Sequence, residues 1–373
     1  MRICFILNYS KLYGANKSIL SVIQTFLSKG HQAHVILPES GPITEIFKKK
    51  NINFSVIPHY SAFLYIKPSF RYLLLPFLFL INVLVFPYLL LIVSKFNPNV
   101  IYSNTSAENM GVFIAKILNL KHIWHIREFM SLDHNAYFIF GKKMKSRLIN
   151  MSDRSIYVSN SVLEEVHSMR RSVKYKVIYN GVKSRMKLSP SLNCNNEPVF
   201  GIVGILDSGK QQDIAIEYFN KLLLYYPNAK LYIFGDKKGS FKNKLFNLVD
   251  DLGLKEKVHF KGFINSQDAI YSSIDILLMF SRSEGFGRVT IESALHGVPV
   301  IGFNNAGTSE LIIDKRTGCL FKDFDSFLEC VNFIMNSANY NLIREQAFLN
   351  ANKRFNVRQY CDAVYSFVLN KIE

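Results

Sequence analysis

The chain has 373 residues, 49% of them hydrophobic, which is enough for two domains with cores of ordinary size and disfavours a single domain. Lys and Arg number 45 against 28 Asp and Glu, so the net charge is +17 and implies an anionic partner: nucleic acid, anionic lipid or a phosphorylated substrate. The sequence has no zinc-finger spacing, aromatic–basic RNA-binding signature or basic heptad segment, so we expect no nucleic acid among the partners.

Cysteine usage and the N-terminus bear on where the protein works. The five cysteines are scattered without paired spacing, so they indicate neither a zinc site nor a disulfide framework and fit a reducing cytoplasm. Met1 leads directly into the strand-like run Arg2–Leu7, without an apolar leader that ends in a small-residue cleavage site. We therefore expect no export.

Short strand-like runs alternate with longer helical patterns along the first half of the chain. The runs are Ile3–Leu7, Ala33–Leu37, Asn53–Ile57, Val100–Ser103 and His122–Ile126. Such alternation predicts a parallel sheet built from right-handed crossovers. We expect residues 1–183 to form one α/β domain on this sheet.

Two strand ends in this domain carry candidate site residues. A turn that contains Gly14 follows the first strand and precedes a helix, so a ligand can approach the backbone closely there. At the end of a later strand, alternation puts His125 and Arg127 on the same face. A lone His on a strand is more often a packed or surface residue than a catalytic one, and Arg127 with Glu128 would alternatively form part of a site for an acceptor phosphate.

The stretch Leu73–Val93 contains no charged residue and would be about 31 Å long as one helix, which matches the hydrocarbon core of a bilayer. Pro76 and Pro87 interrupt it, and strands of one sheet are expected on both sides of it. A full crossing would put halves of one domain on opposite sides of the membrane. We therefore expect a broken helical hairpin that dips into one leaflet, with a buried core helix and a true span as alternatives. Three flanking cations would meet the lipid phosphates: Lys67, Arg71 and Lys95.

The second half of the chain repeats the strand–helix alternation. Residues 184–198 are polar, contain two prolines and are predicted to be a linker. A second α/β domain is expected over residues 199–348, and residues 349–373 include a helical pattern from Val357 to Ile372. The predicted strands of this domain are Val199–Gly204, Leu231–Phe234, Val258–Phe260 and Ile274–Phe280.

The residues after the last of these strands carry the most informative pattern. Glu284 and Glu292 flank a turn with two glycines, and Thr290–His296 is predicted to be a helix. Free amides at a helix start favour an anion, while two carboxylates accept hydrogen bonds from sugar hydroxyls. The pattern predicts a site for a ligand that is partly phosphate and partly hydroxylated. The alternative is a surface loop with two solvated glutamates.

From Glu284 onward the sequence resembles a known family, the retaining nucleotide-sugar-dependent glycosyltransferases with two Rossmann-like domains (GT-B type, group 1 or family 4-like). The family's mark is a Glu, seven residues and a second Glu, followed here by His296–Ile301, Asn305–Ile312 and Thr317–Leu320. Ala306 departs from the Gly that the family usually shows. The resemblance implies an α/β fold in which two doubly wound domains face each other across a cleft. The first domain would bind the acceptor, the second the nucleotide sugar, and the C-terminal helix would pack back on the first.

The resemblance also implies roles for single residues. Glu284 would contact the transferred sugar, Glu292 the ribose, and Lys210 the donor diphosphate. The family has an Arg at the position of Ile205, so one expected cation is missing there, and Arg282 or Arg288 would take its place. A His near the end of the strand that carries His125 and Arg127 would reach the transferred sugar. The implied catalytic residues are Glu284, Lys210, His125 and Arg127, and the implied donor-binding residues are Gly14, Gly204, Lys210, Glu284, Gly285, Phe286, Gly287 and Glu292.

The implied activity is transfer of a hexose from a nucleoside diphosphate sugar to a hydroxyl acceptor, with retention at the anomeric carbon and without a metal or other cofactor. The basic first domain and the apolar stretch favour a lipid-linked saccharide acceptor, as in bacterial surface polysaccharide synthesis. They also predict a cytoplasmic protein held at an anionic membrane surface, on the inner face of the cell membrane. The alternatives are a non-catalytic sugar-nucleotide-binding protein of the same fold, suggested by Ile205, and a nucleotide-sugar epimerase.

Overall fold

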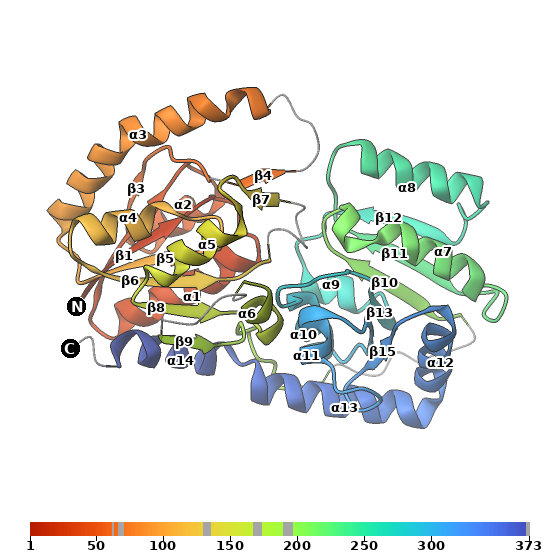
Figure 1. Cartoon of the computed structure of the whole chain (residues 1–373). Coiled ribbons are helices and arrows are strands. Elements are labelled where there is room, and N and C mark those ends of the chain that lie inside the picture. Colours follow the sequence, from red (N-terminus) through yellow and green to blue (C-terminus); the bar gives the residue numbers. More distant parts are fainter. Residues whose placement is uncertain (62, 66–70, 130–135, 167–173, 189–196, 371–373) are drawn as a thin grey trace. The chain divides into compact units, whose positions relative to one another are not determined.

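The computed structural model describes residues 1–61, 63–65, 71–129, 136–166, 174–188 and 197–370 (Figure 1). It consists of two compact units: unit 1 comprises Met1–Gly181 and the chain from Val357 onward, and unit 2 comprises Val182–Asn356. The sequence suggested boundaries at 183/184 and 348/349. The second differs because helix α13 (Ser337–Arg354) continues through residue 349 as part of unit 2.

Unit 1 is built on a seven-stranded parallel sheet in the order β3-β2-β1-β5-β6-β8-β9. The sequence order reverses between β1 and β5, which is the topological switch point where doubly wound sheets bind ligands. The strands are β1 (Arg2–Leu7), β2 (Gln32–Leu37), β3 (Asn53–Val56), β5 (Val100–Asn104), β6 (Lys121–Ile126), β8 (Arg154–Tyr157) and β9 (Lys174–Val177). A separate antiparallel ribbon pairs β4 (Phe63–Tyr65) with β7 (Ala136–Phe138).

Alternating side chains of this sheet build a core on each face. Phe5 of β1 joins the core beneath α1 (Gly14–Ser28), α2 (Pro42–Lys49) and α14 (Val357–Leu369). Cys4 joins the core on the opposite face, beneath the last turns of α3 (Arg71–Phe96) and beneath α4 (Met110–Ile117). The remaining helices of unit 1 are α5 (Gly141–Asn150) and α6 (Asn160–Val166).

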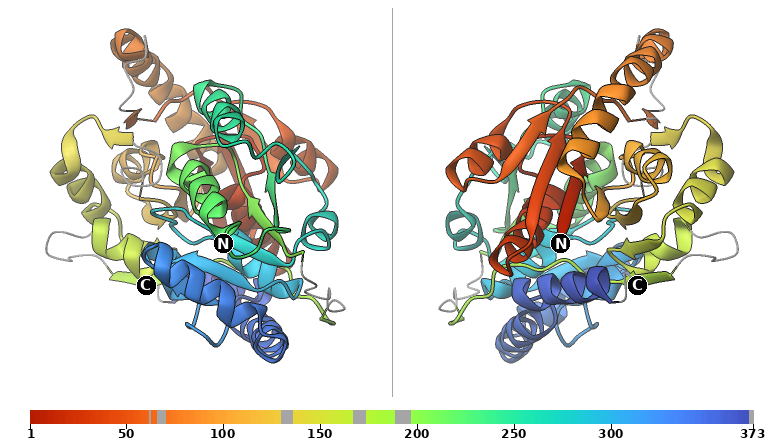
Figure 2. Two further views of the ribbon diagram at one scale, coloured as in Figure 1. Left: turned by 90° about the vertical axis from the view of Figure 1, so that its right-hand side faces the viewer. Right: turned by 90° about the vertical axis from the view of Figure 1, so that its left-hand side faces the viewer.

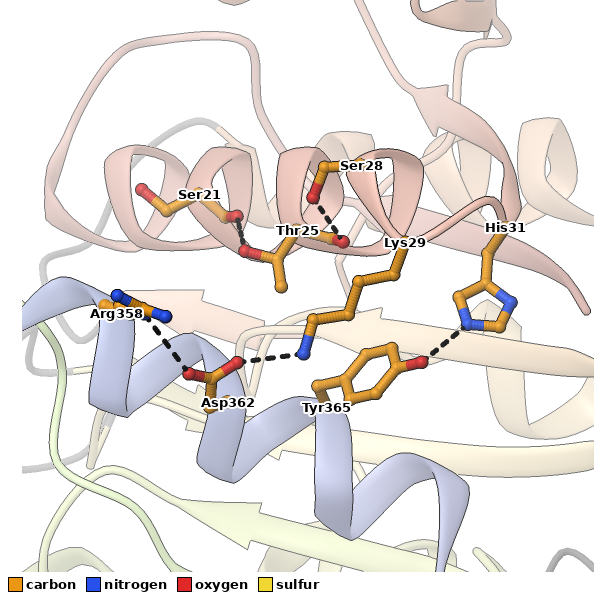
Figure 3. A network of polar contacts seen from close by, with 8 residues as sticks. All are labelled: Ser21, Thr25, Ser28, Lys29, His31, Arg358, Asp362 and Tyr365. Atoms are coloured by element: carbon orange, nitrogen blue, oxygen red, sulfur yellow. Dashed lines mark hydrogen bonds and ion pairs between the residues drawn. The ribbon is translucent and has the colours of Figure 1, made fainter.

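Helix α14 packs against α1, although Lys29 and Asp362, which meet there, lie 333 positions apart in the sequence. Lys29 Nζ lies 2.9 Å from Asp362 Oδ1 and 3.9 Å from the centre of the Tyr365 ring (Figure 3). The Tyr365 hydroxyl lies 2.9 Å from His31 Nε2. These contacts supplement the apolar packing of Val364 and Val368 and attach the C-terminal helix to unit 1.

The predicted break in the apolar stretch is wrong, because α3 is one helix that includes both Pro76 and Pro87. By length and composition α3 could cross a membrane, and only 11% of its most apolar part is buried inside the protein. Asn82 holds the helix by accepting from the Tyr60 amide (2.8 Å) and donating to the Tyr60 carbonyl (2.9 Å). A single crossing is excluded, since β1 pairs with β5, which follows α3, and with β2, which precedes it.

Unit 2 is built on a six-stranded parallel sheet in the order β12-β11-β10-β13-β14-β15, with its switch point between β10 and β13. Its strands are β10 (Val199–Val203), β11 (Lys230–Phe234), β12 (Val258–Gly262), β13 (Ile276–Met279), β14 (Val300–Phe303) and β15 (Cys319–Phe321). Its helices are η1 (Ser208–Lys210), α7 (Gln212–Leu222), α8 (Ser240–Asp251), α9 (Gln267–Tyr271), α10 (Arg288–Leu295), α11 (Ala306–Leu311), α12 (Phe324–Met335) and α13. The predicted fold class, two doubly wound α/β domains, is confirmed.

The first part of the predicted linker is bonded to unit 2. The Arg185 amide donates to Asn352 Oδ1 (3.3 Å), and the Arg185 side chain forms an ion pair with Asp268 on α9. Residues 189–196 of that linker lie outside the described residues. Residues 184–188 therefore belong to unit 2 rather than forming a free connection.

Candidate functional site

Three segments meet at the carboxyl edge of the unit 2 sheet, on either side of its switch point. The first follows β10 and ends at Lys210, the second follows β13 and runs through Glu284 into α10, and the third is the first turn of α11, after β14. Parallel strands end at one edge, so the residues that follow them gather there although they are far apart in sequence. The predicted donor-binding residues of the second domain lie on the first two segments.

Lys210 and Glu284 form an ion pair between Nζ and Oε1. Lys210 is the last residue of η1, a turn that Asp207 caps by accepting from the Gly209 amide at 3.1 Å. The Glu284 side chain is 13% exposed and that of Lys210 is 32% exposed, so the pair lies at the surface with the carboxylate on the inner side. The structure brings together the ammonium and the carboxylate that the sequence predicted for one site.

Two glycines let the β10 and β11 ends approach each other behind Lys210. Gly204 follows β10 and has φ +158°, and a Cβ on it would lie 4.0 Å from Lys210 Cε. A Cβ on Gly235 would lie 1.9 Å from the Gly204 carbonyl oxygen, a distance that no side chain tolerates. Gly204 thus contributes backbone beside Lys210, in accord with the position predicted for it.

The turn between Glu284 and α10 is buried and tightly packed. Gly287 is the N-cap of α10 with φ +81°, a left-handed conformation that favours glycine. Gly307 of α11 donates from its amide to the Glu284 carbonyl at 2.9 Å, and a Cβ there would lie 2.5 Å from the same oxygen. Phe286 is 4% exposed and its ring packs on Phe355, with ring centres 5.8 Å apart. Phe286 is therefore a packing residue, and its side chain faces the interior.

Glu292 lies in the second turn of α10 and is 8% exposed. Its Oε1 is 3.5 Å from Arg288 Nη2, one helical turn earlier. The buried Tyr271 hydroxyl lies beside the same carboxylate, and burial together with that negative charge raises the pKa of Tyr271 well above its ordinary value. Each carboxylate of the motif thus faces a cation of its own, Lys210 for Glu284 and Arg288 for Glu292.

Three buried hydroxyls around this edge were missed by the sequence reasoning. They belong to Ser283, Thr290 and Thr308, and within the part of the chain that the structure describes none of the three oxygens has a hydrogen-bond partner. A buried hydroxyl without a partner costs about 1–3 kcal/mol, so each of these groups lowers the stability of this edge unless a further group satisfies it. Sequence gives no signal for them, because Ser and Thr are common at turns and helix starts.

The structure places His125 and Arg127 inside unit 1, on the sheet face that α14 covers. His125 is 0% exposed, and its Nδ1 lies 2.6 Å from the Tyr102 hydroxyl. Burial and the neighbouring Arg127 hold the pKa of His125 well below its ordinary value, so the ring is neutral. Within the described residues His125 Nε2 has no hydrogen-bond partner and the side chain has no exposed surface, so the catalytic role of His125 stays a prediction.

Arg127 is 6% exposed and its guanidinium is committed to buried neutral partners. It donates to Asn104 Oδ1 and Asn180 Oδ1, both at 2.6 Å, and to the Tyr360 hydroxyl at 2.9 Å. The predicted same-face placement of Arg127 and His125 holds, because Arg127 Nη2 lies 3.2 Å from His125 Nδ1. Arg127 joins three strand ends to α14, which is a structural position rather than a phosphate site.

Gly14 begins α1 at the carboxyl edge of the unit 1 sheet, as the sequence predicted. The loop before it is fixed by Asn16, whose Nδ2 donates to the carbonyls of Tyr9 and Lys11, both at 2.9 Å. Across the switch point, Thr105 Oγ1 donates to Asn8 Oδ1 at 3.0 Å.

In the described part of the chain, no three His, Cys, Asp or Glu side chains are grouped closely enough to hold a metal ion.

Two family models match the chain and meet at residue 185. Residues 13–185 match Glycosyltransferase Family 4, and residues 185–354 match Glycosyl transferases group 1. Among curated proteins, the chain is 34% identical over 142 residues to the O-antigen biosynthesis glycosyltransferase WclY of Escherichia coli, which covers 36% of this chain and 38% of that protein. It is 25% identical over 177 residues to the poly(glycerol-phosphate) alpha-glucosyltransferase of Bacillus subtilis, covering 46% of this chain and 25% of that protein. These alignments span less than half the length of the relatives.

Solved structures resemble the whole chain. HepE of Anabaena, in complex with UDP-glucose, has a TM-score of 0.82 at 20% identity and covers 99% of this chain and 100% of its own. The lipopolysaccharide outer core galactosyltransferase WaaB, in its apo form, has a TM-score of 0.75 at 19% identity and covers 100% of both chains. At such identities the likeness shows the fold alone.

Proposed function

We propose that this chain, which belongs to the family 4 and group 1 glycosyltransferases through its two domains, transfers a hexose from a nucleoside diphosphate sugar to a hydroxyl acceptor with retention at the anomeric carbon. The observation that carries the proposal is the Lys210–Glu284 ion pair at the carboxyl edge of the unit 2 sheet, beside the start of α10 and Glu292. The UDP-glucose complex of HepE supports a nucleotide sugar as donor.

Each group at this edge has a part in the proposed transfer. The backbone amides at the start of α10 and the Lys210 ammonium would take the diphosphate, whose leaving oxygen gains negative charge in the transition state. Lys210 would exchange Glu284 for the diphosphate, which frees the Glu284 carboxylate to accept hydrogen bonds from sugar hydroxyls. Glu292 would accept from the ribose. Because these groups stabilise the leaving diphosphate, we propose that transfer needs no divalent metal.

We further propose a lipid-linked saccharide as acceptor and a place at the inner face of the cell membrane. Helix α3 supports this, since Leu84 is 68% exposed and Phe79 is 60% exposed on a helix that is long and apolar enough to enter lipid. The exclusion of a single crossing favours a helix that lies in one leaflet. The E. coli relative named for O-antigen biosynthesis supports surface polysaccharide synthesis.

The test begins with a screen of nucleoside diphosphate sugars for thermal stabilisation of the purified protein. With the donor found, Glu284→Gln should lower transfer at least about 100-fold. The same variant should bind the nucleoside diphosphate about two- to fivefold more tightly, because Lys210 no longer has a competing partner. Glu329→Gln, exposed on α12, is the matched control. Transfer by Glu284→Gln at the wild-type rate would count against the role of Glu284. Loss of wild-type transfer when a metal chelator is added would count against the proposal that no divalent metal is needed.

One observation favours a second function, a sugar-nucleotide-binding protein without turnover. Ile205 stands beside Gly204, where the resemblance implies an arginine, and it is 37% exposed, so this position supplies no cation. A protein of this kind would bind the nucleotide sugar but neither transfer nor hydrolyse it. Ile205→Arg would then create turnover, whereas in an active enzyme it would change only the rate.

A further inference from the structure

A second exposed apolar surface lies in unit 1, outside α3. We call it the β7–α5 patch; it covers residues 136–150 and contains no Asp or Glu. Its exposed apolar side chains are Tyr137 (48%), Ile139 (42%), Phe140 (58%) and Met144 (38%). The exposed cations among them are Lys142, Lys143 and Arg147. Side chains of this size are normally buried, so their grouping on one short segment indicates a contact surface.

The inward side of the patch is firmly attached to unit 1. Lys145 is buried, with its Nζ 4.1 Å from the Trp124 ring and 2.9 Å from Asn109 Oδ1. Phe138 is 7% exposed, and Leu148 is 5% exposed. The outward apolar side chains are therefore displayed by a fixed strand and helix rather than by a loose loop.

The β4–β7 ribbon connects the patch to α3. β4 precedes α3 along the chain, β7 precedes α5, and the two strands pair over three residues. Figure 2 shows α3 and α5 projecting on the same side of unit 1, with the ribbon between them. Helix α3 supplies apolar surface with few charges, whereas the patch supplies apolar surface and cations together.

We propose that the β7–α5 patch is a second membrane-contacting element, which places Phe140 and its apolar neighbours at the boundary between headgroups and acyl chains and binds anionic lipid phosphates through Lys143 and Arg147. The proposal rests on the proposed membrane association and extends it to a segment outside the apolar stretch. Lys142 is not counted, since it pairs with Glu165 on α6 at 2.7 Å.

Charge decides between a membrane and a second copy of this chain. Two copies of the patch in contact would bring like charges together on a molecule of net charge +17, whereas an anionic bilayer offers both an apolar layer and the opposite charge. Long basic side chains keep their charge at the phosphates while their stems lie on apolar surface. The patch therefore fits an anionic lipid surface.

The experiment is co-sedimentation of the full chain with vesicles of phosphatidylcholine alone and of phosphatidylcholine mixed with phosphatidylglycerol. Lys143→Gln with Arg147→Gln should lower binding to the anionic vesicles about 30-fold, at about fivefold per cation, and leave binding to neutral vesicles unchanged. Ile139→Ser with Phe140→Ser should lower binding to both kinds at least about tenfold. The matched control in unit 2 is Leu342→Ser with Leu349→Ser, at exposed positions of α13.

Distinct results separate this proposal from the broader one. If the patch variants bind like the wild type while Leu80→Ser with Leu84→Ser on α3 does not, the patch is not a membrane element although the protein is membrane-associated. If the patch variants change the oligomeric state and not vesicle binding, the surface belongs to a second copy and the proposal is overturned. Thermal stabilisation by the donor, measured on every variant, reports on unit 2 alone and keeps the transferase proposal separate.

Discussion

The first turn of α11 offers two opposite perturbations at neighbouring positions, Ala306 and Gly307. A Cβ on Gly307 would lie 2.5 Å from the Glu284 carbonyl oxygen and 2.9 Å from that of Gly285, where ordinary contact begins at 3.4 Å. Gly307→Ala must therefore displace the Glu284 turn by about 1 Å, at a cost of about 2 kcal/mol in unfolding free energy. For a unit of this size the Tm should fall by about 4–8 °C. Because a 1 Å misplacement of site groups can cost about 100-fold in rate, transfer should fall by about that factor.

Ala306→Gly should act in the other direction. Ala306 has φ +49°, a left-handed conformation that costs a residue with a Cβ about 1 kcal/mol or more. Glycine relieves that strain, so the Tm should rise by about 2 °C, with transfer unchanged. Gly239→Ala is the control for backbone strain without a clash, since Gly239 has φ +142° and open space around its Cβ position.

The assay pairs thermal unfolding with donor binding and transfer on all three variants. Wild-type stability and wild-type transfer in Gly307→Ala would show that the turn yields without cost, and the reasoning from the close contact would then be refuted. A loss of transfer in Gly239→Ala equal to that in Gly307→Ala would likewise remove the link between the contact and the site.

Two further predictions concern the interior of unit 1. Tyr360→Phe removes the hydroxyl that accepts from Arg127 Nη2 at 2.9 Å, so the unfolding free energy of unit 1 should fall by about 1–3 kcal/mol. Stabilisation of unit 2 by the donor should persist. An unchanged denaturation midpoint of unit 1 would contradict the prediction. Burial lowers the pKa of His122 from 6.5 to about 3, so below pH 6.5 the unfolded chain takes up a proton that the folded chain does not. The contribution of neutral His122 to the free energy of unfolding is fully present above pH 6.5 and should fall on acidification by up to about 1.4 kcal/mol per pH unit. In His122→Asn the free energy of unfolding should depend less steeply on pH between about pH 6.5 and 5.

The fold was predictable because inner strands of parallel sheets are continuous apolar runs. The run Ile274–Phe280 contains β13 (Ile276–Met279), and the predicted Val199–Gly204 contains β10 (Val199–Val203). The carboxyl ends of neighbouring parallel strands share one edge, so placing Lys210 and Glu284 after their strands was sufficient to bring them to one site. Their ion pair joins residues 74 positions apart in the sequence, a contact that no local pattern encodes.

The errors arose where tertiary packing overrides local pattern. Two prolines predicted a broken hairpin, yet packing of Leu89 and Val93 in the core and the Asn82 contacts with Tyr60 maintain one helix. Alternation correctly put His125 and Arg127 on one face, but only the fold reveals that α14, from the far end of the chain, covers that face. The β7–α5 patch likewise exists because Lys145 faces inward over Trp124 while its neighbours face outward.

The pairing of charges at the unit 2 edge bears on how the proposed enzyme would divide its binding energy. Lys210 is held by Glu284 before any donor arrives, so the gain from the Lys210–diphosphate contact in the ground state is reduced by the loss of that ion pair. As the bond between the sugar and the diphosphate broke, the diphosphate would gain charge and attract Lys210 more strongly than Glu284 does. In the proposed enzyme the interaction would therefore contribute more to the transition state than to donor binding, which would raise kcat rather than lower KM. Glu292, held by Arg288 on its own helix, has no such exchange to make and would contribute to both states alike.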